Sequence, residues 1–308
     1  MEIIFGPIHS RRFGKSLGVD LSPAQKQCNF DCVYCELQRG KSVDSMQKVI
    51  APAEVLQAIK EALYIHKIDV LTLTANGEPT LYPHLEELIS AIKDILPDSI
   101  KLLLLTNGSL LWKEEVRRAL AKLDIVKFSC DSLEERAFRR IDRPHASLSL
   151  EQIKAGIAYF AKSFKGEIVA EVLFVKGIND TLSQAEQIAA FLSTLPLTRV
   201  DLGSIDRPPA YKVEAISDEE LHKLAQCFYA YPHLEVNCPK RIAHKGQNAL
   251  KTYTQEQLIN LLKRRPLSIK DAQNMFSQET LAMLDSLIDS GILRQCQIAS
   301  DTFYQVIN

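Results

Sequence analysis

The segment Cys28-Asn29-Phe30-Asp31-Cys32-Val33-Tyr34-Cys35 places three thiols within eight positions, shortly after an apolar run and Pro23. Iron–sulfur clusters are normally held by four cysteine thiolates, so a compact set of three leaves one iron able to bind a group that is not protein. The spacing therefore predicts a cluster with Cys28, Cys32 and Cys35 as metal ligands. An open metal position is typical of catalysis.

Two other interpretations of the three thiols remain open. A structural zinc site requires four protein ligands, commonly two close pairs, and no second pair follows. Three buried, incidental thiols are the other alternative. The remaining cysteines are solitary, which is typical of residues that pack as small hydrophobic groups; they are Cys130, Cys227, Cys238 and Cys296. Seven cysteines in this arrangement do not indicate a disulfide framework.

The composition is that of a globular chain with a large core. Of its 308 residues 46% are hydrophobic and 24% charged, and 37 basic against 38 acidic side chains give a net charge of -1. This balance provides no overall attraction to nucleic acid or anionic membranes. Met1 to Gly14 lacks the features of a signal peptide, and no stretch reaches the ~18 to 20 apolar residues that span a bilayer. We therefore expect a cytoplasmic protein without a membrane partner.

Short apolar runs alternate with helical patterns from residue 17 to about residue 230, which predicts βα units around a parallel sheet. Six strands with six following helices could form an open doubly wound sheet or an incomplete (β/α) barrel. Both arrangements place chemistry at the carboxyl ends of the strands. The predicted strands are Leu17 to Leu21, Val70 to Thr74, Leu102 to Thr106, Ile125 to Ser129, Ile168 to Val175 and Val200 to Gly203.

The pattern changes after about residue 230. Asn237 to Lys251 is an irregular basic stretch without a carboxylate, and three helical patterns and two strand-like runs follow it. We expect a winged-helix-like α+β domain at 254–308, an α/β core that carries the cysteine motif at 1–215, and the last core helix with the basic linker at 216–253. The helices are predicted at Gln255 to Lys263, Ile269 to Phe276 and Gln278 to Asp289, and the strands at Ile292 to Ile298 and Phe303 to Ile307.

The C-x3-C-x2-C spacing, with Tyr34 before the third cysteine, resembles the signature of the radical S-adenosylmethionine (SAM) superfamily. The resemblance covers roughly residues 10 to 210 and implies an α/β fold, a partial (β/α)6 TIM-like barrel. It also implies a 4Fe-4S cluster and SAM as cofactors, and a one-electron donor of the flavodoxin or ferredoxin type as a partner. In such enzymes the reduced cluster breaks a carbon–sulfur bond of SAM, and the resulting 5'-deoxyadenosyl radical removes a hydrogen from the substrate.

Further motifs agree with this resemblance, because each follows a successive predicted strand. Asn76-Gly77-Glu78-Pro79 is similar to the family's Gly-Gly-Glu segment, which holds the methionine amino group, although Asn76 replaces the first glycine. Singly, these residues could serve turns or helix caps. Together they predict one site around the mouth of a barrel. The SAM contacts that the resemblance implies are Tyr34, Gly77, Glu78, Asn107, Ser129, Asp131 and Ile178.

The substrate is predicted from two flanking motifs. Gly6 to Asp20 and Asp206 to Ala210 resemble a bacterial subgroup that is grouped with wyosine synthetases, which modify tRNA guanosine. Arg11, Arg12 and Arg207 could donate to an anionic substrate at the mouth, or could be solvated surface arginines. A tRNA base is therefore a possible substrate, supported by the basic linker and by Lys263-Arg264-Arg265.

Other substrates and another class of function remain open. A peptide, a protein or a small molecule could be the substrate, since an exposed strand of the C-terminal domain could pair with an extended chain. An iron–sulfur or zinc-dependent transcription regulator is the third reading. Gln278 to Leu293, the expected recognition helix, contains Glu279, Asp285 and Asp289 and no basic residue. We therefore expect no sequence-specific reading of DNA.

Overall fold

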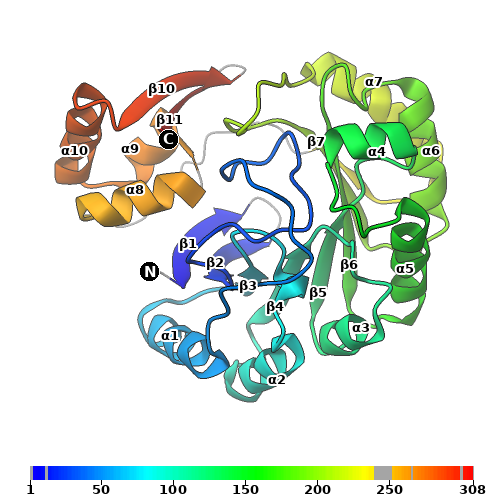
Figure 1. Cartoon of the computed structure of the whole chain (residues 1–308), viewed down its shortest axis with the longest axis horizontal. Coiled ribbons are helices and arrows are strands. Elements are labelled where there is room, and N and C mark those ends of the chain that lie inside the picture. The colour runs from blue at the N-terminus through cyan, green and yellow to red at the C-terminus, as the bar shows by residue number, and fades with distance from the viewer. Residues whose placement is uncertain (1–2, 11–12, 239–251, 265, 299–300, 308) are drawn as a thin grey trace.

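The computed structural model describes residues 3–10, 13–238, 252–264, 266–298 and 301–307 (Figure 1). The predicted substrate contacts Arg11 and Arg12, most of the basic linker and Arg265 lie outside the described residues. Among the described residues, no helix combines the length and the apolar character that a membrane crossing requires.

One eight-stranded sheet forms the body of the molecule, with its strands in sequence order. The first strand is antiparallel to the second, and all other neighbours are parallel. The strands are β1 (Ile4–Ser10), β2 (Gly14–Asp20), β3 (Val70–Thr74), β4 (Lys101–Thr106), β5 (Ile125–Ser129), β6 (Glu167–Phe174), β7 (Arg199–Ser204) and β8 (Val236–Asn237). The six predicted strands, β2 to β7, are confirmed. The edge strands β1 and β8 were not predicted.

Helices cover the outer face of the sheet (Figure 1). Each buries one apolar face; α1, for example, buries Val55 and Ile59 completely. Burial of such a side chain contributes about 1.5–3 kcal/mol, so this face holds the helix to the sheet. The helices are α1 (Pro52–Ile65), α2 (Leu85–Ile95), α3 (Glu114–Leu120), α4 (Glu135–Ile141), α5 (Leu150–Ser163), α6 (Leu182–Ser193) and α7 (Asp218–Tyr229), with a 3-10 turn at Pro79–Leu81.

Side-chain caps fix the start of two of the helices. Ser217 and Glu220 make a reciprocal capping box at the start of α7, and Thr181 accepts a hydrogen bond from the Gln184 amide at the start of α6. Ser149 is the N-cap residue of α5 but makes no side-chain capping bond.

The C-terminal residues form a smaller unit with its own hydrophobic core, in which Leu258, Phe276 and Leu284 are fully buried. Its three-stranded antiparallel sheet has the order β10-β11-β9. The predicted three helices and two strands are confirmed, and β9 is additional. The winged-helix assignment and the domain boundaries stay predictions. The elements are α8 (Gln255–Arg264), β9 (Leu267–Ser268), α9 (Ile269–Met275), α10 (Gln278–Asp289), β10 (Leu293–Ile298) and β11 (Asp301–Val306).

Candidate active site

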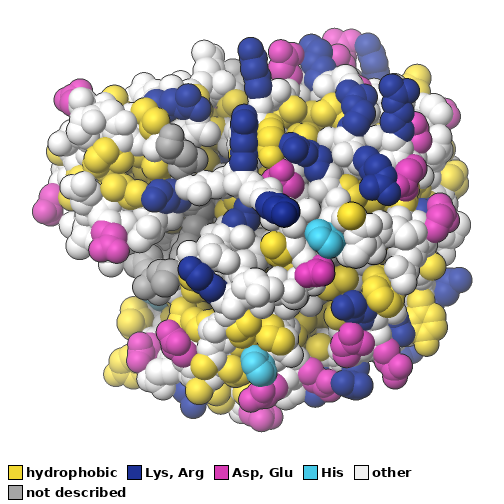
Figure 2. Space-filling view, in the orientation of Figure 1, with side chains coloured by type: hydrophobic (Ala, Val, Ile, Leu, Met, Phe, Trp, Pro, Cys, Tyr) yellow, Lys and Arg dark blue, Asp and Glu magenta, His cyan; other side chains and the backbone are white. Residues whose placement is uncertain are grey.

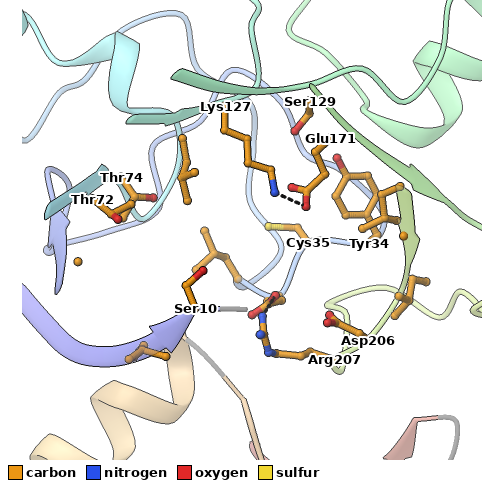
Figure 3. A pocket seen from close by; sticks show the side chains of 18 of the residues that line it. Ser10, Tyr34, Cys35, Thr72, Thr74, Lys127, Ser129, Glu171, Asp206 and Arg207 are labelled. Atoms are coloured by element: carbon orange, nitrogen blue, oxygen red, sulfur yellow. Dashed lines mark hydrogen bonds and ion pairs between the residues drawn. The ribbon is translucent and has the colours of Figure 1, made fainter. Parts of the chain in front are cut away.

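A cavity of about 660 Å³ lies on the inner side of the sheet (Figure 3). Its wall includes residues of β2 to β7, the loop that carries the cysteines, and the C-terminal unit, which contributes Leu261, Ser268 and Phe303 among others. The volume falls within the range of about 300–1,000 Å³ that is usual for small-molecule sites. Segments distant in sequence therefore meet around one cavity.

The cysteines lie in a long loop, residues 21–51, between β2 and α1, which Gln27 holds together. The buried Gln27 side chain donates to the Ser22 hydroxyl (2.7 Å) and the Lys48 carbonyl (2.9 Å). Its carbonyl oxygen accepts from the amides of Gln47 (2.7 Å) and Lys48 (2.9 Å). These bonds join the two ends of the cysteine loop and hold Gln27 in place, so the position of Cys28, the next residue, is fixed by them.

Gly77 is the point where the end of β3 meets the cysteine loop. Its backbone forms a parallel bridge with Gln27 and has a φ of 137°. A Cβ atom at this position would lie 1.9 Å from the Gln27 carbonyl oxygen, so only glycine fits. Gly77 also lines the cavity, which places the predicted cofactor contact and the start of the cysteine motif side by side.

Cys28, Cys32 and Cys35 are partly exposed free thiols of one loop. Burial raises the pKa of Cys32 strongly, and Asp142, Cys28 and Cys35 raise it further. Burial also raises the pKa of Cys28 and of Cys35. Without a bound cation these groups therefore stay protonated near neutral pH. Metal binding would have to displace the protons, which is how cations normally stabilise thiolates.

Amide groups surround the first of these thiols. The Phe30 amide donates to the Cys28 sulfur at 3.4 Å, and the Asn107 side-chain nitrogen lies 3.8 Å from it. Asn107 also donates to the Asn29 side chain at 2.7 Å. Amide hydrogen bonds to cysteine sulfur are one of the means by which proteins tune iron–sulfur clusters. Asn107, a predicted SAM contact, therefore lies beside the cysteine motif but is not among the residues that line the cavity.

The Glu78 carboxylate is buried and joins the ends of β3 and β4. It accepts hydrogen bonds from the Thr80 hydroxyl (2.7 Å), the Thr106 hydroxyl (2.5 Å) and the Asn107 amide (2.7 Å). Burial raises the pKa of Glu78, and these hydrogen bonds oppose the rise. Asn76 and Gly77 line the cavity but Glu78 is not among its lining residues. The carboxylate thus supports the wall on which the predicted contacts lie.

Tyr34 and Asp131 connect the cysteine loop to β5 and β6. The Tyr34 hydroxyl donates to Asp131 at 2.5 Å, and the Leu173 amide donates to the other carboxylate oxygen at 2.7 Å. Burial raises the pKa of Asp131. Tyr34 and Ser129 line the cavity, whereas Ile178 packs with Tyr34 in an apolar cluster and is not among the lining residues. Tyr34 and Ser129 are thus the two of these four that reach the cavity wall.

A buried ion pair that was not predicted forms part of the cavity wall. The Lys127 ammonium group lies 2.6 Å from Glu171 and 3.3 Å from Asp201, and Lys127 and Glu171 point into the cavity (Figure 3). Buried lysines are rare unless paired, and such groups concentrate at functional sites. The signal in the sequence was a charged residue between apolar neighbours in each of three strands, namely Lys127 in β5, Glu171 in β6 and Asp201 in β7.

Arg207, a predicted substrate contact, lines the cavity, but a carboxylate already accepts a hydrogen bond from it. Its guanidinium donates to Glu36 at 2.5 Å. Burial would lower the pKa of Arg207, but Glu36 and Asp206 raise it. Because Glu36 directly follows Cys35, this pair connects the loop after β7 with the cysteine motif.

Residues 23–192 match the family model described as the Radical SAM superfamily. This chain belongs to the radical SAM superfamily. The match begins just before the three cysteines and ends in α6, so it covers the strands and loops that form most of the cavity. The chain is therefore a radical SAM enzyme, and enzymes of this family use a 4Fe-4S cluster and SAM.

Named relatives agree with this assignment. A UPF0026 protein of Helicobacter pylori is 44% identical over 98% of this chain and 97% of its own length. A probable GTP 3',8-cyclase of Methanococcus aeolicus is 30% identical over 63% of this chain and 62% of its own length. The solved structure of TYW1 with a lysine-pyruvate adduct bound has a TM-score of 0.51 at 18% identity, covering 70% of this chain and 73% of that one. The last similarity shows a common fold.

The residues present fit both radical SAM cofactors. Three neighbouring thiols, with amide groups around Cys28, supply ligands of the kind an iron–sulfur cluster takes. Among the described residues, no three His, Cys, Asp or Glu side chains converge on one ion; the thiolates of a cluster bind different iron atoms and do not have to converge. The cavity touches Cys35, which leaves room beside the cluster for a second group.

Proposed function

We propose that this radical SAM enzyme removes a hydrogen atom from a substrate that carries a purine base, with a tRNA base as the substrate. The observation that carries the proposal is the Lys127–Glu171 pair, which lines the same cavity as Cys35 and Tyr34. Cys28, Cys32 and Cys35 hold the cluster in this proposal. The SAM site consists of Tyr34, Gly77, Glu78, Asn107, Ser129, Asp131 and Ile178.

The ion pair offers a donor and an acceptor side by side, which suits the edge of a guanine base. A lysine ammonium group has three N–H donors, and two of those of Lys127 can be directed at Glu171 and Asp201. The third N–H can donate to a ring carbonyl. The Glu171 carboxylate accepts only, and its side chain is 34% exposed, so it can receive a ring or amino N–H. The name of the GTP 3',8-cyclase relative indicates a guanine nucleotide as well.

In this proposal the residues of the chain orient the base and limit the access of water. When bound, the reduced cluster and SAM supply the one-electron cleavage of a carbon–sulfur bond that leads to hydrogen abstraction. Lys127 on β5 and Glu171 on β6 orient the base from the wall of the cavity that these strands form. The C-terminal unit closes the opposite wall through residues such as Phe303, which limits the access of water. Arg207 and Glu36 separate the base from the surrounding solvent at the cysteine loop.

The proposal is tested by comparing the modified nucleosides of total tRNA from cells with and without the gene. We expect at least one modified nucleoside to disappear, and a chromosomal Lys127→Met variant to lose it as well, because the base can no longer be oriented. Lys162→Met, on the exposed side of α5, is the matched control and should keep the modification. A nucleoside profile that does not change on deletion contradicts the proposal and points to peptide or small-molecule substrates.

A further inference from the structure

A group of basic side chains covers the outside of the cysteine loop. In Figure 2, Lys and Arg side chains gather on the face that carries this loop and α4. Lys26, Arg39 and Arg143 surround Tyr211 and Asp31, and we call these three the basic patch. Arg39 and Arg143 are exposed residues, so their charge is available to a partner in solution.

The basic patch is held in place by its contacts. The Arg39 and Arg143 guanidinium groups each lie 4.5 Å from the centroid of the Tyr211 ring. The Tyr211 hydroxyl donates to Asp31, and Lys26 and Arg143 lie 3.2 and 3.7 Å from the same carboxylate. Two of the three cations therefore share the Asp31 carboxylate, and the partners of Arg39 are the Tyr211 ring and a backbone carbonyl, which leaves an excess of positive charge.

The backbone at Arg143 adds a second indication. Arg143 is the one described non-glycine residue with a positive φ, 47°. Such a conformation costs free energy in a residue with a side chain, and it concentrates at functional sites. Here it carries the guanidinium group over Tyr211.

The basic patch lies beside the metal ligands but outside the cavity. Arg39 donates to the Ala210 carbonyl at 2.7 Å, and the Ala210 amide donates to the Cys35 carbonyl at 2.9 Å. Asp31 lies between Cys28 and Cys32 in the sequence. By contrast, Lys26, Arg39 and Arg143 are not among the residues that line the cavity. The charge therefore surrounds the outer side of the cysteine loop, whereas the cavity lies on its inner side.

We infer that the basic patch is the docking surface for an acidic one-electron carrier protein, of the flavodoxin or ferredoxin type. On docking, one electron passes from the reduced carrier to the cluster, so that the carrier is oxidised and the cluster reduced by one electron. Charge complementarity raises the association rate of such short-lived complexes, which typically bury less than about 1,200 Å². A substrate in the cavity and a carrier on the basic patch could then be bound together. The inference rests on the radical SAM chemistry and not on the purine substrate.

The test measures 5'-deoxyadenosine formation from SAM by the reconstituted holoenzyme without oxygen, with two reductants. Dithionite is a small ion that requires no protein docking, whereas flavodoxin kept reduced by its NADPH-dependent reductase does. We expect an Arg39→Glu/Arg143→Glu double variant to lose about tenfold or more of the flavodoxin-supported rate. Its dithionite-supported rate and iron content should stay within about twofold of the parent, since dithionite does not depend on electrostatic attraction between two proteins.

The matched control is Lys60→Glu/Lys162→Glu, which makes the same change of charge at exposed positions on α1 and α5. This control should keep the flavodoxin-supported rate. The parent's flavodoxin-supported rate should also fall with ionic strength more steeply than that of the Arg39/Arg143 variant. If the glutamates impair the cluster itself, an Arg39→Gln/Arg143→Gln variant removes the charge without reversing it and decides the question.

Three results would overturn the inference. The first is an equal loss with both reductants in the Glu and the Gln variants. The second is a flavodoxin-supported rate that neither variant changes. The third is a loss of tRNA binding at an unchanged flavodoxin-supported rate, which would assign the basic patch to RNA. A parent protein that forms no 5'-deoxyadenosine even with dithionite would instead contradict the cofactor chemistry on which the inference rests.

Discussion

A Cys35→Ala variant is expected to lose both the iron–sulfur cluster and the cleavage of SAM. With three protein ligands, the loss of one leaves two thiolates, and the two thiols that remain have pKa values that burial raises. Purified without oxygen, the parent should be brown and form 5'-deoxyadenosine with a strong reductant, and the variant should be colourless and inactive. Iron analysis and product chromatography measure the two properties.

Cys227→Ala provides the matched control for this variant. Cys227 is a free cysteine on α7, and its sulfur lies 4.0 Å from the Leu182 carbonyl, away from the motif. This variant should keep iron content and activity at the parent's level. A Cys35→Ala protein that retains the parent's iron and product formation contradicts the ligand assignment. Tightly bound stoichiometric zinc in the parent, in place of iron, would contradict it as well.

Six of the eight strands of the main sheet could be predicted because each is a short apolar run between helical patterns. The two edge strands could not be predicted, for physical reasons. β1 contains Gly6 and Pro7, and proline is tolerated in sheets mainly at edges and bulges, so this segment does not look like a strand. β8 has only two residues and depends on its pairing with β7. Both require a neighbouring strand that the local sequence does not reveal.

For a similar reason, the cysteines of the candidate site could be predicted but some of its other contacts could not. The cysteines are close in sequence, so their spacing alone predicts a metal site. The Tyr34–Asp131 hydrogen bond joins residues 97 positions apart, and the Lys127–Glu171 pair spans 44. Such contacts depend on how the strands are arranged around the cavity. In the sequence, the only local sign of such a contact is a charged residue in the middle of a buried strand. This sign was not used to predict a role for Lys127.

The two predicted carboxylates illustrate what a motif leaves unspecified. Glu78 and Asp131 follow successive strands and could be predicted as parts of one site. Their oxygens, however, accept hydrogen bonds from Thr80, Thr106 and the Leu173 amide. Spacing in the sequence identifies the residue, whereas the direction of its side chain depends on partners supplied by other strands. A contact with SAM would therefore have to share these oxygens or use the neighbouring backbone.

A Gly77→Ala variant is expected to lower the cluster content strongly, although no metal ligand is changed. The added Cβ atom would lie 1.9 Å from the Gln27 carbonyl oxygen, and the φ of 137° is strained for alanine. Strain of this kind costs about 1–3 kcal/mol, and the contact with backbone adds to it. Because the Glu78 amide donates to that same carbonyl at 3.0 Å, relief of the contact has to move the segment that leads into Cys28.

Gly203→Ala separates this displacement from a general effect of replacing glycine. No atom lies within 4 Å of a Cβ atom built at Gly203, and no positive φ is recorded there. We expect Gly203→Ala to bind iron like the parent, and Gly77→Ala to bind less than about half as much and to unfold several degrees lower. Equal iron content and melting temperature in the two variants would mean that the bridge between Gly77 and Gln27 does not position the cysteine loop. The distance between β3 and Cys28 would then have no bearing on how the cluster is held.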